Sequence, residues 1–152
     1  MLTGKSLKKK DMTVDEKILF HELMKKSLRL SALVNSPFDE THYEQTEKIV
    51  EQTKSFHSYV GERNCVYCYC LIGRNLAQLK KVWKKGKHFI DGVYTILPIE
   101  HYSKSQIYFL IDLYNLAQEY NKVAYLTMPL RELKSNFKVV KELVHQNADF
   151  WR

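Results

Sequence analysis

The residues best suited to metal or nucleophile chemistry are three cysteines that lie close together, Cys65, Cys68 and Cys70. Zinc sites use pairs of ligands that short turns bring onto one ion, and the fourth ligand here would be His57 or His88. The cysteines instead follow a helical apolar pattern, which places Cys70 on a different helix face from Cys65 and Cys68. We therefore predict core cysteines, which pack as small hydrophobic side chains, and no metal site.

Other combinations that could support catalysis are incomplete. A cysteine nucleophile needs an adjacent base and an orienting group, and the histidines of this chain are scattered without a motif. Thr3-Gly4-Lys5-Ser6 resembles the end of a phosphate-binding loop, but the glycine that such a loop has five residues before Gly4 is missing. We predict a protein without catalytic residues, cofactor or small-molecule substrate.

A dense cluster of lysines follows the cysteines, at Lys80, Lys81, Lys84, Lys85 and Lys87. On a helix, pairs of these residues four apart form parallel ridges of like charge, whose members repel each other. An acidic protein surface or a phosphate backbone would relieve that repulsion. The alternative is a solvated helix end, where cations interact favourably with the helix dipole.

The net charge of the whole chain is +7, which also favours acidic partners. A second basic ridge is predicted on the last helix of the chain. The residues predicted to contact an acidic protein or nucleic acid are Arg74, Lys80, Lys81, Lys84, Lys85, Lys87, Lys134, Lys138 and Lys141.

The cysteines and all lysines of the cluster except Lys87 belong to one predicted helix, residues 62–85. Its apolar residues recur at spacings of three and four and therefore share a face: Cys65, Cys68, Ile72, Leu76, Leu79 and Trp83. Gly73 inside this helix costs about 1 kcal/mol relative to alanine. We therefore expect another helix to approach closely at Gly73.

Four more helices are predicted around this one, at residues 13–34, 37–60, 104–121 and 129–147. The apolar side of the first is a broad stripe made of Val14, Ile18, Phe20, Leu23, Met24, Leu28 and Leu33. Thr13 and Glu16 form a capping box at the start of the first, and Ser103 and Gln106 form another before residue 104. With only 5 glycines and 3 prolines, the chain lacks the turns of an all-β protein. The predicted fold is an all-α, five-helix bundle with an irregular linker at 86–102, in which residues 93–97 are a candidate extended segment.

The domain organisation follows from these elements. Residues 1–12 are predicted to be a flexible basic tail, residues 13–147 a single α-helical domain, and residues 148–152 a short tail that stays exposed unless something covers Phe150 and Trp151. The helix at 104–121 is apolar nearly all round, so it lies at the centre of a bundle or beneath a partner. We predict a subunit interface there, formed by Tyr108, Phe109, Leu113 and Leu116.

The sequence shows no targeting or membrane segment. The basic N-terminus is not followed by the apolar stretch of a signal peptide, and no run approaches the roughly 18 apolar residues of a membrane span. An odd number of cysteines does not suggest a disulfide framework. We expect an intracellular protein of the nucleus or cytoplasm that is not bound to a membrane.

The predicted helix 62–85 opens with Glu62-Arg63-Asn64 and continues through Tyr69, Arg74, Leu79, Trp83 and Gly86. With these residues it resembles the third helix of a GINS subunit. GINS is the four-subunit factor that joins the eukaryotic replicative helicase.

The flanking segments are similar to GINS subunits in the same order, over residues 14–130. Pro37-Phe38-Asp39-Glu40 opens the preceding helix, and Ser103-Lys104-Ser105-Gln106 resembles the Leu-Ser-x-x-Glu element of the family, with Gln106 in place of glutamate. The small β-rich second domain of GINS subunits and a counterpart of helix 129–147 are not recognisable.

The resemblance implies a non-enzymatic subunit of a GINS-like DNA replication complex, a scaffold between helicase components in a hetero-oligomer. The alternative from composition is a small basic nucleic-acid-binding protein, for instance a viral one, that acts as a homo-oligomer. In that case the lysine ridges would contact phosphates, and binding would depend steeply on salt.

Overall fold

The computed structural model describes residues 12–28, 46–63, 66–82, 89–95, 97 and 102–152. Within these ranges the chain forms eight α-helices and one 3-10 helix, with no strand beyond an isolated bridge between Leu28 and Leu126. The elements are α2 (Val14–Lys26), α3 (Thr46–Arg63), α4 (Val66–Val82), α5 (Phe89–Val93), α6 (Lys104–Glu119), η3 (Asn121–Tyr125), α7 (Leu130–Ser135), α8 (Phe137–Gln146) and α9 (Ala148–Trp151). The prediction of an all-α fold is confirmed.

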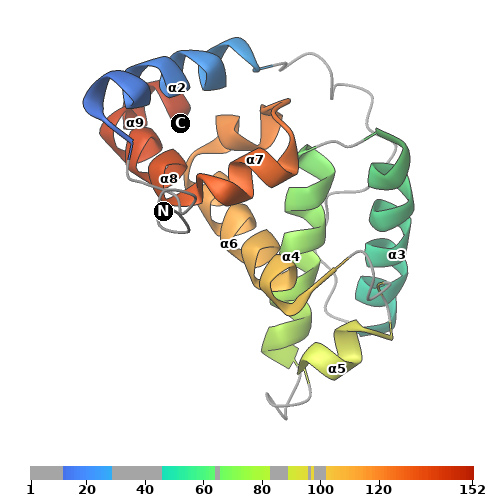
Figure 1. Ribbon diagram of the computed structural model, residues 1–152. Coiled ribbons are helices and arrows are strands. Elements are labelled where there is room, and N and C mark those ends of the chain that lie inside the picture. The colour runs from blue at the N-terminus through green and yellow to red at the C-terminus, as the bar shows by residue number, and fades with distance from the viewer. Residues whose placement is uncertain (1–11, 29–45, 64–65, 83–88, 96, 98–101) are drawn as a thin grey trace, which may run out of the picture.

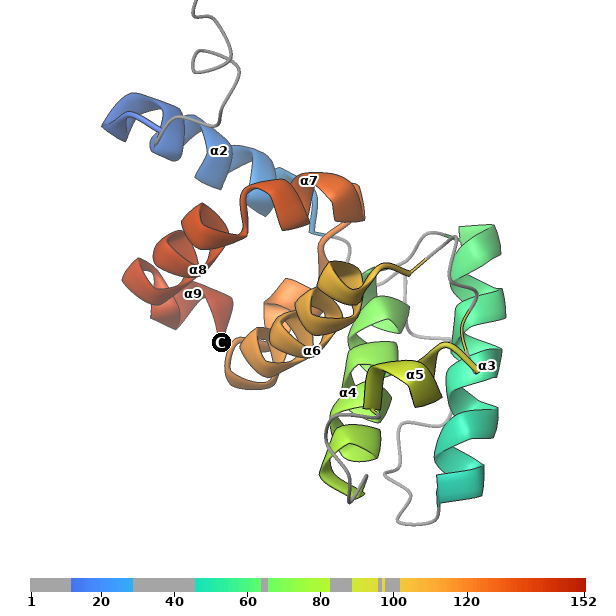
Figure 2. The same cartoon turned by 60° about the horizontal axis from the view of Figure 1, so that its bottom comes forward.

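Helix α6 lies between two groups of helices (Figure 1, Figure 2). On one side it packs against α4, which in turn contacts α3 and α5. On the other side lie α7, α8 and α9, and the rings of Phe109 in α6 and Phe137 in α8 meet edge to face at 5.1 Å. Helix α2 packs against α8 at one edge of the molecule, and the polar helix α3 lies at the opposite edge.

The contact between α4 and α6 is closest at Gly73. A Cβ atom on this residue would overlap the backbone carbonyl of Leu110 and would lie 3.1 Å from Cβ of Tyr114. The close helix approach predicted at Gly73 is therefore confirmed. The predicted apolar face of this helix is also buried where the structure describes it, at Cys68, Ile72, Leu76 and Leu79.

The N-terminal end of the first helix matches its prediction, whereas its C-terminal end does not. Thr13 Oγ1 accepts the amide of Glu16 at 3.1 Å, and Glu16 Oε1 accepts the amide of Thr13 at 2.8 Å, which completes the capping box. Helix α2 ends at Lys26 instead of continuing to residue 34. The reason is that the chain turns at Ser27, and Leu28 enters the bridge to Leu126.

The boundary between α3 and α4 differs from its predicted position. Helix α3 passes Gly61, where we predicted its end, and continues to Arg63. Glycine lowers helix stability by only about 1 kcal/mol and does not by itself stop a helix. The predicted start at residue 37 and two members of the apolar stripe, Cys65 and Trp83, lie outside the described residues.

The linker at 86–102 contains a short helix. Helix α5 buries Phe89 and Val93, and a turn follows at residues 94–95. The extended segment considered for residues 93–97 is therefore wrong at its first three positions. Leu97 is buried, and residues 96 and 98–101 lie outside the described part of the chain.

The C-terminal region differs most from its prediction. The predicted helix 129–147 is divided at Asn136 into α7 and α8, although its apolar face remains buried at Leu130, Leu133, Val140 and Val144. The short tail predicted at 148–152 is instead mostly helical. Residues 148–151 form α9, and the fold covers the side chain of Trp151, which is 0% exposed.

Candidate interaction surfaces

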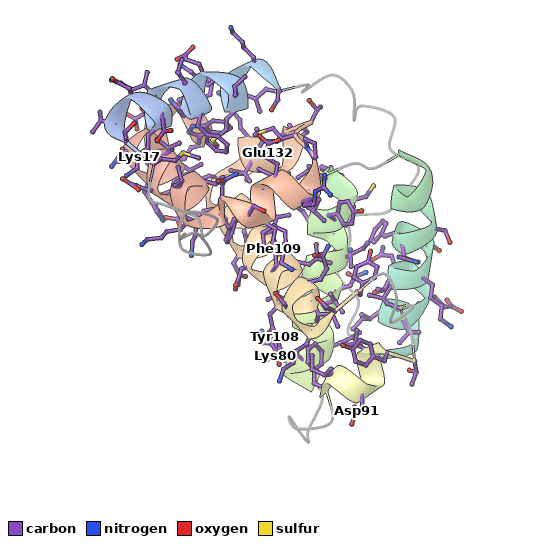
Figure 3. All side chains as sticks on the ribbon, in the orientation of Figure 1. Lys17, Lys80, Asp91, Tyr108, Phe109 and Glu132 are labelled. Atoms are coloured by element: carbon purple, nitrogen blue, oxygen red, sulfur yellow. The ribbon has the colours of Figure 1, made fainter. Side chains whose placement is uncertain are left out.

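Two lysines of the predicted cluster lie on the surface near the C-terminal end of α4. Lys80 and Lys81 are both exposed, and the ammonium of Lys80 lies 5.1 Å from the centroid of the Tyr108 ring (Figure 3). A cation at this end of a helix also interacts favourably with the helix dipole. The remaining members of the cluster, Lys84, Lys85 and Lys87, lie outside the described residues.

The second predicted basic ridge lies on α7 and α8. Lys138 and Lys141 are exposed, and Lys134 is half-buried. The ammonium of Lys141 lies 5.0 Å from the centroid of the Phe137 ring. Because the helix breaks at Asn136, Lys134 belongs to a different helix from the other two lysines, and the predicted continuous ridge is interrupted.

Arg74, predicted as a contact to an acidic partner, is instead a buried residue. Its side chain is only 3% exposed. Its Nε donates to Oδ1 of Asn75 at 3.1 Å, and its Nη2 donates to Oε1 of Gln52 at 2.6 Å. The same Gln52 oxygen accepts Nδ2 of Asn75 at 2.9 Å. Arg74 thus joins α4 to α3, and this part of the predicted binding surface is wrong.

The subunit interface predicted on α6 is covered by the chain itself. Phe109, Leu113 and Leu116 are 7%, 0% and 6% exposed. Of the four predicted residues only Tyr108 is half-buried, and Lys80 lies over its ring. The helix is apolar on all sides because it is the central helix of the fold, which was the other explanation for its pattern.

An open pocket of about 350 Å³ lies where α4, α6 and η3 meet. Its lining includes the rings of Tyr67 and Tyr125, whose centroids are 5.8 Å apart, together with Arg74, Gln118 and Asn121. None of the described residues that line it is a histidine or a carboxylate. The pocket therefore offers hydrogen-bonding groups and aromatic faces.

Two histidines make hydrogen bonds with tyrosine hydroxyls. His57 Nδ1 lies 3.1 Å from the hydroxyl of Tyr102, and His145 Nδ1 lies 2.6 Å from the hydroxyl of Tyr120. Burial raises the pKa of Tyr102, which makes it a poor source of phenolate. Within the described ranges, no three histidine, cysteine or carboxylate side chains are grouped so that they could hold a metal ion.

Most of the large apolar side chains that are exposed among the described residues lie on α2. Four side chains of this helix are strongly exposed: Val14 at 74%, Ile18 at 57%, Leu19 at 66% and Leu23 at 55%. The helical periodicity places Val14 and Ile18 on one flank of α2, and Leu19 and Leu23 on the other. Grouped apolar side chains on a surface mark interaction sites, whereas single ones need no explanation.

The opposite face of α2 is firmly attached to the C-terminal helices. Phe20 and Met24 are buried against them, and Nζ of Lys17 pairs with Oε2 of Glu142 in α8 at 2.9 Å. The end of the helix is fixed as well, because the amide of Thr127 donates to the carbonyl of Ser27 at 3.0 Å. These contacts hold the two exposed apolar flanks of α2 in a defined position.

The exposure of this surface differs from what the sequence pattern predicted. Val14, Ile18 and Leu23 were expected on the apolar side that packs against the rest of the chain, and this prediction is wrong because all three side chains are exposed. The sequence signal that indicates this surface is the breadth of the apolar pattern in the first helix. Apolar residues stand next to each other at 18–20 and 23–24, and together they cover more than one helix face.

Comparison with known proteins gives no match: no family model, no curated protein and no solved structure is similar to this chain. Among the described helices, none combines the length and apolar character that crossing a membrane requires.

Proposed function

We propose that this chain is a non-enzymatic helical subunit of a protein assembly, and that it joins its neighbours through α2. The observation that carries the proposal is the exposure of four large apolar side chains on this one helix, Val14, Ile18, Leu19 and Leu23. The buried inner face of α2 already contacts the rest of the chain, so these side chains are left for a partner.

The resemblance of the α4 sequence to GINS subunits supports a more specific version of the proposal. In that version the chain is a scaffold in a GINS-like replication complex, between helicase components in the nucleus. Its net charge of +7 suits contact with acidic partners. The interface assigned to α6 by the sequence pattern is then replaced by α2.

Co-expression tests this version directly. The full chain is produced together with the GINS subunits of the same organism, and the complex is analysed by size exclusion with light scattering. A complex of fixed stoichiometry is expected. A chain that elutes separately from the GINS subunits would overturn the GINS assignment.

Serine substitutions test the part played by α2. The variant Val14→Ser/Ile18→Ser/Leu19→Ser/Leu23→Ser should leave the assembly while its circular dichroism and Tm stay close to those of the wild type. Phe150→Ser is the matched control, because Phe150 is the other exposed large apolar side chain among the described residues, at 39%. Equal assembly by both variants would refute the role of α2.

Nucleic acid is the second candidate partner. The observation in its favour is the exposed pair Lys80 and Lys81, in a segment whose sequence continues with further lysines. Neutralising phosphates releases counterions, so duplex DNA binding should weaken steeply with salt. Lys80→Glu/Lys81→Glu should weaken binding and reduce the salt slope by about one for each lost contact. Lys138→Glu/Lys141→Glu on α8 makes the same charge change elsewhere, and equal losses in both variants would exclude a specific role for Lys80 and Lys81.

A further inference from the structure

One flank of α2 carries a stripe of two leucines, with opposite charges at its two ends. Glu16, Leu19, Leu23 and Lys26 follow at spacings of three, four and three, so they lie along one side of the helix. The two leucines are 66% and 55% exposed. An acidic side chain stands at the N-terminal end of this stripe and a basic one at the C-terminal end.

The order of these four residues along α2 is complementary to the same four residues of a second copy when the two helices run antiparallel. In a two-fold symmetric pair, each residue faces a partner that faces it in return. Leu19 and Leu23 lie two residues either side of position 21, and Glu16 and Lys26 lie five residues either side of it. An antiparallel pair of α2 helices therefore sets leucine against leucine and carboxylate against ammonium. A parallel pair would set like charges against each other.

We propose that α2 binds the α2 of a second copy of this chain, antiparallel, through Glu16, Leu19, Leu23 and Lys26. The inference rests on the proposed function, because both use the exposed apolar flanks of α2, and it names the partner on one flank. Val14 and Ile18, on the other flank, remain outside this contact.

The charged groups at the ends can make these pairs without leaving their contacts within the monomer. The capping box uses Oε1 of Glu16, which accepts the Thr13 amide at 2.8 Å, and a carboxylate has a second acceptor oxygen. The ammonium of Lys26 carries three donors. The inner face of α2 stays buried against the C-terminal helices, so dimerisation needs no rearrangement of the fold.

The contact is small, and association should be reversible. Helix α2 has 13 residues, which corresponds to a length of about 20 Å. A pair of such helices buries less than the roughly 1,200 Å² of a standard stable interface. Dimer formation should therefore depend strongly on protein concentration.

Sedimentation equilibrium of the full chain tests the apolar part of the contact. The mass should rise with concentration from 18.1 kDa towards twice that value. Leu19→Ser/Leu23→Ser should stay monomeric, whereas Val14→Ser/Ile18→Ser should dimerise like the wild type. The inference would be overturned by a wild-type chain that stays monomeric up to millimolar concentration, or by the same loss of dimer formation in both variants.

Charge reversal tests the antiparallel geometry. Each single variant, Glu16→Lys or Lys26→Glu, places like charges in both 16–26 pairs of the dimer. This repulsion should weaken association about tenfold. An equimolar mixture of the two variants restores both opposite-charge pairs, and dimerisation should return in the mixture only. A mixture as weak as its components would contradict the geometry. Circular dichroism melts show that each variant is folded, since Glu16→Lys also removes half of the capping box.

The two proposals fail in different ways. A chain that is monomeric alone but enters a hetero-oligomer through α2 would overturn the second-copy partner and leave the proposed function standing. A four-serine variant that assembles like the wild type would remove the role of α2, and both proposals with it.

Discussion

The indole N–H of Trp151 donates to Nε2 of His21 across 3.0 Å and thereby joins α9 to α2. An indole N–H can only donate, so the Nε2 atom of His21 must be unprotonated and its ring neutral. The contact fixes both the last residues of the chain and the helix that carries the exposed apolar surface. Its dependence on a neutral histidine makes it sensitive to pH.

We expect the folded protein to lose stability as the pH falls below about 6.5. Burial lowers the pKa of His21 from its ordinary value of 6.5, and nearby Lys25 lowers it further. The folded state therefore binds fewer protons here than the unfolded state. The stabilisation is fully present above pH 6.5 and disappears as the pH falls through the lowered pKa. Urea unfolding at pH 7.5, 6 and 5 measures this loss.

His21→Gln separates this effect from other titrations. Glutamine retains an acceptor for the indole but does not titrate, so the variant should lose less stability between pH 7.5 and pH 5 than the wild type. His145→Gln is the matched control, because His145 is exposed and bonds to Tyr120 instead of Trp151. An unchanged pH dependence in His21→Gln would show that the Trp151 contact is not the sensitive group.

Truncation of Trp151 should be costly although it is the penultimate residue. Its side chain is 0% exposed, and Trp151→Ala should lower the free energy of unfolding by about 3–5 kcal/mol. The neighbouring Phe150 is 39% exposed, and its ring lies 4.4 Å from the ammonium of Lys122. Phe150→Ala should cost about 1 kcal/mol. Equal urea midpoints for the two variants would mean that α9 is not docked.

Alanine at position 73 should destabilise the protein although alanine favours helices. The added Cβ would overlap the carbonyl of Leu110, so α4 and α6 must move apart. We expect a net loss of about 1–3 kcal/mol, against a gain of about 1 kcal/mol from helix propensity alone. Chemical denaturation with an unchanged m-value checks this. A variant that is more stable than the wild type would contradict the observed helix crossing.

Loss of the Gln52 side chain should weaken the contact between α3 and α4. Its Oε1 accepts from both Arg74 and Asn75, and Gln52→Leu removes this acceptor from two buried donors. A cost of about 1–3 kcal/mol is expected. Glu51→Leu is the control, because Glu51 is exposed, and its effect should stay within about 0.5 kcal/mol. Similar losses for both variants would mean that the buried network contributes little.

Most of the helical fold is predictable from the sequence because its signals are local. The capping box at Thr13, the apolar spacing along α4 and the cost of Gly73 each depend on a few neighbouring residues. They correctly indicated a helix start, a buried face and a close crossing. The last five residues are too short for such a pattern. The burial of Trp151 comes from contacts with a segment 130 positions away.

The candidate surface was not predictable in the same way. Helical periodicity tells which residues share a face but not which face meets the rest of the chain, so Ile18 and Leu23 were assigned to the core. Arg74 was predicted to contact an acidic partner, whereas its side chain is buried. Its acceptor Gln52 lies 22 positions away on another helix and becomes evident only once α3 and α4 are packed.

Site-specific photo-crosslinking in intact cells tests the central claim, that α2 is the docking surface, most directly. A benzophenone residue replaces Leu23 in one variant and Asp112, an exposed residue of α6, in the control. We expect one discrete crosslinked product from position 23, identified by mass spectrometry as a second copy or a companion subunit, and none from position 112. No product from position 23, or the same product from both positions, would contradict this claim.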